Sequence, residues 1–158
     1  MEGSQAKHHN EHAWPKEDFF NRELSWLEFN QRVLDQAKSE SEDAAKRHPV
    51  FERMKFLSIA GSNLDEFFMI RVASINDQYQ AGYNKPDPSG RTPKMQLEQI
   101  SARVGDMVHE MYHVLRQQIL PELRKNGIRL LADGQLTESQ RNYLDDYFEQ
   151  QVYPVLTP

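Results

Sequence analysis

Two apolar segments with helical spacing, separated by a Gly-Ser-Asn turn, constrain this chain more than any other feature. Large hydrophobic residues fill the stretch 56–73 on both sides of Gly61, Ser62 and Asn63. We expect Gly61 and Ser62 to end one helix, because glycine commonly occupies helix ends and disfavours helix interiors. Asn63 would then cap the next helix, with Glu66 three residues later in a capping-box arrangement. Asn63 can therefore act as a cap or face a ligand.

The first half of the chain predicts three helices. A helix over 21–38 begins at Asn21, a good N-cap residue, and carries a wide apolar stripe. Pro49 fits the first turn of a second helix that leads to Gly61. The third helix runs from Asn63 toward residue 80.

The second half adds a long helix and a shorter one. Thr92 and Pro93 open the long helix, which Pro121 should kink or end. Gly127 is a predicted helix stop, followed by a short strand or an extended link over 128–131. Thr137 and Gln140 form a capping box for a last helix. We expect the apolar residues of that helix to face inward: Leu144, Tyr147, Phe148 and Val152.

The predicted fold is therefore all-α, an antiparallel bundle of four or more helices. Residues 1–18 are polar and aperiodic, which predicts a disordered tail. Residues 19–127 form the helical domain, and residues 128–158 form the beginning of a second domain. The apolar last residues favour a cut within a longer protein.

Composition excludes several classes of protein. The 158 residues carry a net charge of −5, which argues against a general binder of nucleic acid or anionic membranes. With no cysteine, disulfides and thiolate metal sites are impossible. The sequence shows neither a signal peptide nor an apolar run long enough for a transmembrane segment. We expect a cytoplasmic protein, with peripheral membrane association left open.

His109-Glu110-Met111-Tyr112-His113 is a literal His-Glu-x-x-His motif. On a helix it places two imidazoles and a carboxylate as zinc proteases require. The third ligand of such a site is not marked in the sequence, so we expect no metal site here.

Basic residues cluster in and near the first three predicted helices. They could form a local face for phosphate, or pair with the carboxylates of Glu23, Glu28, Glu52 and Asp65. Ordinary ion pairing is the favoured alternative. The basic residues are Arg22, Arg32, Arg53, Lys55 and Arg71.

Several ordered segments resemble the N-terminal region of bacterial polyphosphate kinases of the first, histidine-phosphorylating type. The opening segment 20–34 reads FNRELSWLEFNQRVL, and 52–57 reads ERMKFL. The strongest signature is 62–73, SNLDEFFMIRVA, and the closing 153–158, YPVLTP, is similar to the start of the family's head domain. The resemblance covers residues 19–158, and the spacer 39–48 is longer than usual in the family.

The resemblance implies an enzyme that transfers the terminal phosphate of ATP reversibly to inorganic polyphosphate. It implies a phosphohistidine intermediate and Mg²⁺, both in C-terminal domains absent from this chain. None of the six histidines is followed by x-Lys, so the chain has no catalytic residue. The N-terminal domain would form a wall of the ATP site near the adenine, with Asn63 as an ATP-binding residue. The head domain implies a homo-oligomer, and ATP, ADP and polyphosphate are the implied partners. A non-catalytic helical assembly module is the alternative.

Overall fold

The computed structural model describes residues 15–38 and 48–156. Most of the predicted tail, residues 39–47 of the spacer and the last two residues lie outside these ranges. Every regular element in the described ranges is helical, which confirms the all-α prediction. The chain divides after Ile119 into two compact units, which are described separately below. The predicted domain boundary after residue 127 stays a prediction.

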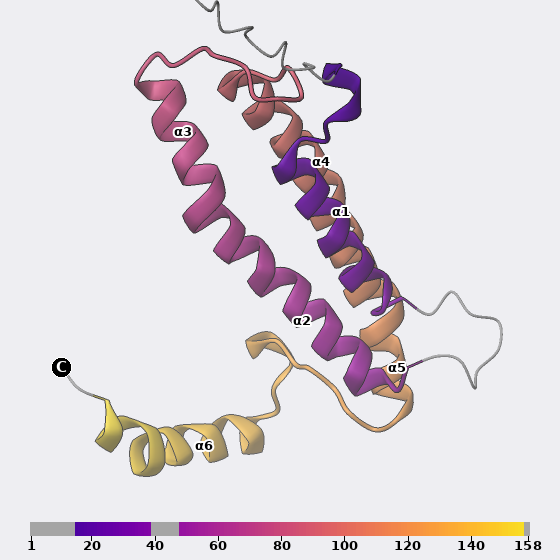
Figure 1. Cartoon of the computed structure of the whole chain (residues 1–158). Coiled ribbons are helices and arrows are strands. Elements are labelled where there is room, and N and C mark those ends of the chain that lie inside the picture. The colour runs from indigo at the N-terminus through magenta and orange to yellow at the C-terminus, as the bar shows by residue number, and fades with distance from the viewer. Residues whose placement is uncertain (1–14, 39–47, 157–158) are drawn as a thin grey trace, which may run out of the picture. The chain divides into compact units, whose positions relative to one another are not determined.

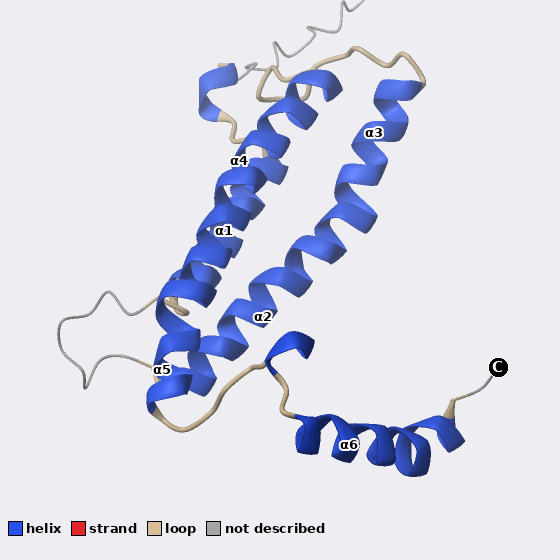
Figure 2. Ribbon diagram, turned by 180° about the vertical axis from the view of Figure 1, so that it is seen from behind, coloured by secondary structure: helices blue, strands red, loops and turns tan. Residues whose placement is uncertain are grey.

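The first unit is built from three long helical rods (Figures 1 and 2). α1 (Arg22–Asp35) packs against α2 (Val50–Phe67) and against α4 (Pro93–His113). α2 continues through a π-helical turn, η3 (Phe68–Val72), into α3 (Ala73–Gln80), and α3 packs against α4. The rod formed by α2, η3 and α3 runs antiparallel to its two neighbours (Figure 1), which gives the predicted antiparallel bundle.

The core of this unit lies where the three rods meet. Each rod contributes apolar side chains spaced three or four residues apart, so one face of each is buried. The buried side chains include Leu27, Leu34, Leu57, Ala60, Leu64, Phe67, Ile100, Val104 and Met107.

The predicted starts of the first helix and of the long helix are confirmed. The Asn21 side chain accepts hydrogen bonds from the backbone N–H groups of Glu23 and Leu24. Thr92 accepts one from Met95, and Pro93 is the first residue of α4. These features depend on a few neighbouring residues, which is why the sequence predicts them well.

The predicted break at Gly61 and Ser62 is wrong, because α2 passes through both residues without interruption. One glycine in a helix interior costs only about 1 kcal/mol. The buried face of α2 continues across the glycine, with Ala60 before it and Leu64 after it. Burial of that face outweighs the local preference for a helix end.

The end of α4 shows how the chain accommodates Pro121. After His113 the chain forms a π-helical turn, η4 (Val114–Ile119), and then α5 (Leu120–Lys125), which contains the proline. A proline inside a helix has no N–H to donate and disturbs the preceding turn. The helix does not end at Pro121: the π-helical turn η4 precedes the proline, and the helix ends only after Lys125.

The second unit begins at α5 and continues through a 3₁₀ turn, η5 (Asp133–Gln135), to α6 (Glu138–Tyr147). Gly127 has a φ of +82°, and its N–H binds the Arg124 carbonyl while the Ile128 N–H binds the Leu123 carbonyl. This Schellman arrangement confirms the predicted stop. The capping box of Thr137 and Gln140 is also confirmed.

The apolar residues of the last helix are not buried as predicted. α6 is followed by the turns η6 (Phe148–Val152) and η7 (Tyr153–Val155). Leu144, Tyr147 and Phe148 are each 45–49% exposed. The spacing of apolar residues marks one face of a helix, but it does not show what covers that face.

Candidate functional site

Asn63 lies in the interior of α2 and is half-buried. It is therefore not the N-cap that the Gly-Ser-Asn turn predicted. Inside an α-helix each backbone N–H is bonded to the carbonyl four residues earlier. The backbone N–H groups of Gly61, Ser62 and Asn63 are therefore not available to a ligand, and any ligand contact at this position must come from side chains.

Three cross-helix contacts follow one another along the line where α1 meets the antiparallel rod, and we call this line the α1–α2 seam. The contacts are Asn63 with Asn30, Phe67 with Trp26, and Arg71 with Glu23. Residues three or four apart share one face of a helix, so each step of one turn adds a pair. The seam is thus polar, aromatic and ionic in succession.

The polar contact is a hydrogen bond between two amides. Asn63 Nδ2 donates to Asn30 Oδ1 over 2.9 Å. Asn30 is fully buried, and its own Nδ2 donates to the Ala60 carbonyl at 3.0 Å and approaches Met107 Sδ at 3.5 Å. Asn30 therefore links α1 to α2 and α4, and it holds the Asn63 side chain in place.

The aromatic contact is a stacked pair. The rings of Trp26 and Phe67 lie 4.6 Å apart with an angle of 4° between their planes. Phe67 is buried, while Trp26 is half-buried. Stacking contributes on the order of 0.5–1.5 kcal/mol beyond the area it buries. The pair fixes the spacing between α1 and α2 one turn from Asn63.

The ionic contact joins Arg71 in η3 to Glu23 in the first turn of α1, with 3.5 Å between Arg71 Nη1 and Glu23 Oε1. Glu23 also lies at the positive end of the α1 dipole, where a carboxylate is favoured. Its second oxygen is buried and has no hydrogen-bond partner among the described residues. Arg71 is therefore the side chain that compensates a largely buried charge.

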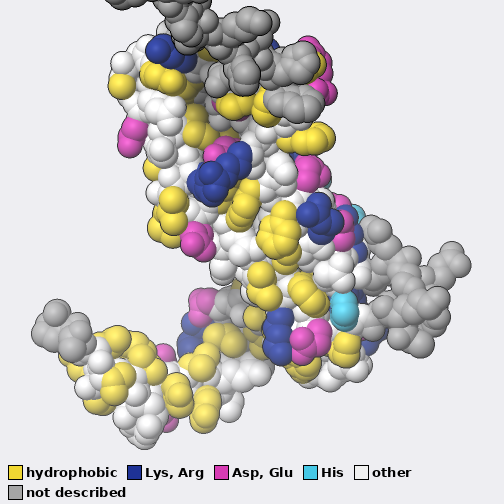
Figure 3. All heavy atoms as spheres, in the orientation of Figure 1, with side chains coloured by type: hydrophobic (Ala, Val, Ile, Leu, Met, Phe, Trp, Pro, Cys, Tyr) yellow, Lys and Arg dark blue, Asp and Glu magenta, His cyan; other side chains and the backbone are white. Residues whose placement is uncertain are grey.

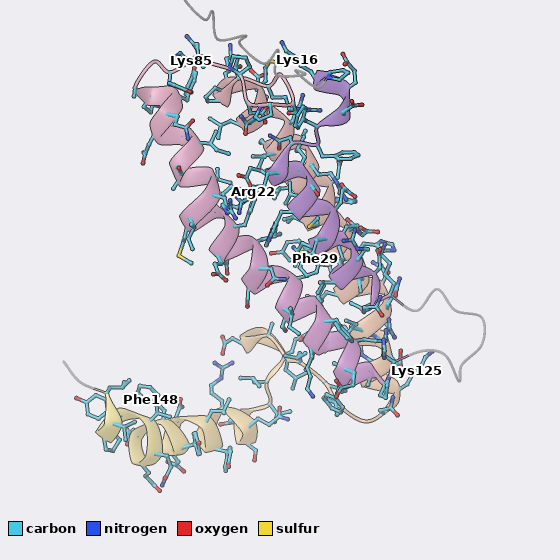
Figure 4. All side chains as sticks on the ribbon, in the orientation of Figure 1. Lys16, Arg22, Phe29, Lys85, Lys125 and Phe148 are labelled. Carbon is cyan, nitrogen blue, oxygen red and sulfur yellow. The ribbon has the colours of Figure 1, made fainter. Side chains whose placement is uncertain are left out.

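Exposed apolar side chains flank Asn63. Ile59, one turn earlier on α2, is 47% exposed, and Ile70 in η3 is 58% exposed. Phe29, which projects from α1 in Figure 4, is 48% exposed. Figure 3 shows such side chains gathered on the face of α1 and α2 that points toward the viewer. Asn63 is thus a half-buried amide with exposed apolar side chains one turn before it and further along the same rod.

The His-Glu-x-x-His motif lies on α4 with Glu110 already bonded to α1. Glu110 forms an ion pair with Lys38 and accepts a 2.7 Å hydrogen bond from Gln31 Nε2. Burial raises the pKa of the Glu110 carboxyl, but Lys38 and Gln31 lower it further, so the pKa lies below its ordinary value. His109 and His113 are exposed. In residues 15–38 and 48–156, no three His, Cys, Asp or Glu side chains are placed to hold a metal ion.

The basic residues of the first helices are mostly engaged with their surroundings. Lys55 pairs with Glu52, as Arg71 does with Glu23, which agrees with the favoured alternative. Arg53 is 1% exposed and donates to the Ala37 carbonyl and to Gln118. It supports the core and is not part of a phosphate-binding face.

The comparisons with known proteins agree with the fold. A family model described as the polyphosphate kinase N-terminal domain matches residues 19–131. The chain belongs to the polyphosphate kinase family. None of the described helices is long and apolar enough to cross a membrane.

Relatives from several bacteria share this segment. The chain is 49% identical over 139 residues to a polyphosphate kinase of Halalkalibacterium halodurans, and the match covers 87% of this chain and 19% of that relative. It is 44% identical over 144 residues to a polyphosphate kinase of Lactiplantibacillus plantarum, covering 90% of this chain and again 19% of the relative. The chain thus spans about a fifth of the length of these curated relatives.

A solved structure extends the agreement to three dimensions. The crystal structure of polyphosphate kinase from Porphyromonas gingivalis superposes with a TM-score of 0.66 at 35% identity. The match covers 88% of this chain and 18% of that one. The helical fold described above is therefore a fold of this family.

Asn30 is the residue of the seam that the sequence did not single out. It lies in the apolar stripe of α1, between Leu27 and Leu34, and all three are fully buried. An asparagine at a core position of an amphipathic helix needs hydrogen-bond partners. That position in the stripe was the signal that could have identified it.

Proposed function

We propose that this chain forms one wall of the ATP site of a polyphosphate kinase, with the Asn63 side chain against the adenine. The enzyme would transfer the terminal phosphate of ATP to polyphosphate through a phosphohistidine. The nucleophile and the Mg²⁺ would belong to parts of the enzyme outside this chain, since none of the six histidines here is followed by x-Lys.

The observation that carries the proposal is the position of Asn63. Its half-buried amide lies among exposed apolar side chains, on a seam held by a buried asparagine and a stacked aromatic pair. Adenine offers an amino donor and ring-nitrogen acceptors at its edge, which an amide can match, and two apolar faces. Rigid support of this kind suits a side chain that orients a base.

The experiment requires a complete enzyme. We would replace the matching segment of the Halalkalibacterium halodurans polyphosphate kinase by this chain, and then compare Asn63→Ala with the parent. Loss of a neutral hydrogen bond costs about 0.5–1.5 kcal/mol, so the KM for ATP should rise about two- to tenfold with a smaller change in kcat. Asn63 is inside α2, so the substitution removes no helix cap.

The matched control is Asn76→Ala, the same change at an exposed position of α3. It should leave the KM for ATP unchanged. An unchanged KM in a well-folded Asn63→Ala enzyme would show that Asn63 serves only the packing of α1 on α2.

A second role is favoured by the exposed apolar residues of α6 and η6. Tyr143 is 67% exposed, and the side chains of Leu144, Tyr147 and Phe148 are exposed as well. We infer that residues 128–158 contribute to homo-oligomer contacts of the head domain. Tyr143→Glu in the same chimera should lower its mass in sedimentation, and an unchanged mass would refute this role.

A further inference from the structure

Asn30 is a fully buried polar side chain whose hydrogen bonds determine how Asn63 is oriented. It contacts the Ala60 carbonyl, Met107 Sδ and the Asn63 amide. The first two of these partners are acceptors that cannot donate. The Nδ2 group of Asn30 must therefore face them, because its oxygen would find no donor there.

The orientation of the Asn30 amide determines which atom of the Asn63 amide faces Asn30 and which faces away from it. With Asn30 Nδ2 on the side of Ala60, its Oδ1 faces Asn63 and can only accept. Asn63 must therefore donate from its own Nδ2, as the 2.9 Å hydrogen bond from Asn63 Nδ2 to Asn30 Oδ1 shows. Asn63 Oδ1 then points elsewhere, and it has no hydrogen-bond partner in the part of the chain that the structure describes.

We propose that Asn30 is a positioning residue that keeps the Asn63 oxygen available to the nucleotide, so that the site selects a purine with a 6-amino group. The inference rests on the proposed contact between Asn63 and the base. A 6-amino group donates to the oxygen, whereas the 6-oxo group of inosine or guanosine would place two acceptors face to face. Asn63 retains one further N–H hydrogen for a neighbouring ring nitrogen.

Burial of Asn30 stabilises this orientation of the two amides. No water reaches Asn30, so a reversed Asn63 amide would set its oxygen against the Asn30 oxygen without compensation. An exposed asparagine can rotate its amide to suit either base, and such a site would not discriminate between them. The discrimination thus originates in a residue that does not touch the nucleotide.

The test is a kinetic measurement on the chimeric polyphosphate kinase described above, with ATP and with ITP as phosphate donors. The affinity for each nucleotide is taken from its KM. We expect the KM for ATP to be about tenfold lower than that for ITP, because sites built around a hydrogen bond reject analogues that lack it.

Variants separate positioning from support of the fold. Asn30→Ala frees the Asn63 amide, so the ratio of ATP to ITP affinity should fall toward one. In Asn30→Asp, burial favours the protonated form of the carboxyl, which can donate its O–H to the Ala60 carbonyl and still accept from Asn63, so this variant should retain the ratio. Asn76→Ala is the control that leaves the ratio unchanged. If Asn30→Ala weakens both nucleotides equally, Asn30 is only a packing residue and the proposal is overturned.

The outcomes distinguish this inference from the function on which it rests. If Asn63→Ala leaves the KM for ATP unchanged, the proposed contact with the base is wrong, and the inference that depends on it is refuted as well. If Asn63→Ala raises the KM for ATP but ATP and ITP have equal KM values in the parent enzyme, the contact stands and only the selectivity is refuted. Should Asn30→Ala fail to fold, equal KM values for ATP and ITP in the parent enzyme would still overturn the proposal.

Discussion

Asn21 joins three parts of the first unit through one amide. Its oxygen accepts from the first turn of α1, and its Nδ2 donates to Asp87 at 2.7 Å and to Gln96 at 3.1 Å. Burial raises the pKa of the Asp87 carboxyl, but hydrogen bonds from Ser89, the Arg91 backbone and Asn21 lower it more, so the pKa lies below its ordinary value. The ionised carboxylate is thus the form that the fold favours.

Substitution of Asn21 should therefore lower the free energy of unfolding by an amount that depends on pH. Asn21→Asp keeps the cap but places a second carboxylate against Asp87, so it should lower the free energy of unfolding by about 2 kcal/mol at pH 7. Stability that depends on a lowered carboxyl pKa is present above the ordinary value and is lost as the pH falls through the lowered one. The gap between variant and parent should accordingly narrow below about pH 4.

Urea unfolding followed by circular dichroism at pH 7 and at lower pH measures this gap. Asn21→Ala is the companion variant, because it removes the cap and the hydrogen-bond donor without adding a charge. Its loss in free energy of unfolding should change less with pH. A gap for Asn21→Asp that stays constant on acidification would contradict the assigned contact with Asp87.

At the scale of single residues, the sequence predicted what depends on near neighbours. The caps at Asn21, Thr92 and Thr137 were found because each acts within three residues. The link from Asn21 to Asp87 spans 66 positions, and the link from Asn30 to Asn63 spans 33. Such contacts require the packed bundle, and a single sequence does not display them.

At the scale of helices, the continuity of α2 through Gly61 leads to a stability prediction. A Cβ added at Gly61 would lie 3.5 Å from Met111 Cε, an ordinary contact. Alanine is favoured over glycine in a helix interior, so Gly61→Ala should raise the free energy of unfolding by about 0.5–1 kcal/mol. Thermal or urea unfolding of the full chain measures it.

Two other glycines give the controls. Gly105 lies inside α4 with open space around a new Cβ, so Gly105→Ala should also stabilise. Gly127 has a positive φ, so Gly127→Ala should destabilise by about 1 kcal/mol. If Gly61→Ala behaved like Gly127→Ala, the helix would end at Gly61 and the continuous α2 would be wrong.

The π-helical turns explain why helix boundaries were harder to predict than helices. η3 and η4 each insert into a longer helical run, and neither follows from the 3.6-residue period used to recognise helices. η4 precedes Pro121, which was a visible signal, whereas no glycine or proline lies within η3.

At the scale of the whole chain, the histidine pair of α4 gives a prediction about metal. Glu110 pairs with Lys38, and two histidines alone are too few ligands for a structural zinc. Tag-free protein should retain less than stoichiometric zinc after dialysis, as measured by elemental analysis. One tightly held zinc per chain, lost on His113→Ala, would revive the protease hypothesis.

A second prediction at this scale concerns catalysis. This chain alone should transfer no phosphate from ATP, because no histidine here has the context of the family's nucleophile. Incubation with γ-labelled ATP and Mg²⁺ should leave the protein unlabelled. Stoichiometric acid-labile, base-stable label on His109 or His113 would contradict the prediction.

The family was predictable from the sequence because its signatures are long and ordered, and residues 19–131 match the family model. The exposure of α6 was not predictable, since its apolar residues show the same spacing as those of the buried helices. Asn63 was predicted as the site residue because the resemblance to the family implied it. Its support by Asn30 and Trp26 became visible only when α1 and α2 were placed together.

The π-helical turn η3 also determines where the rod can change in length. A π-helical turn holds about one residue more than an α-helical turn. Removal of Met69, whose side chain is 71% exposed, could be absorbed there by return to α-helical pairing, with α2 and α3 keeping their buried faces. The same deletion inside α4 would rotate every later residue of that helix by about 100° and expose its core side chains. The turn η3 is therefore the position in the rod where loss of one residue should disturb the core least.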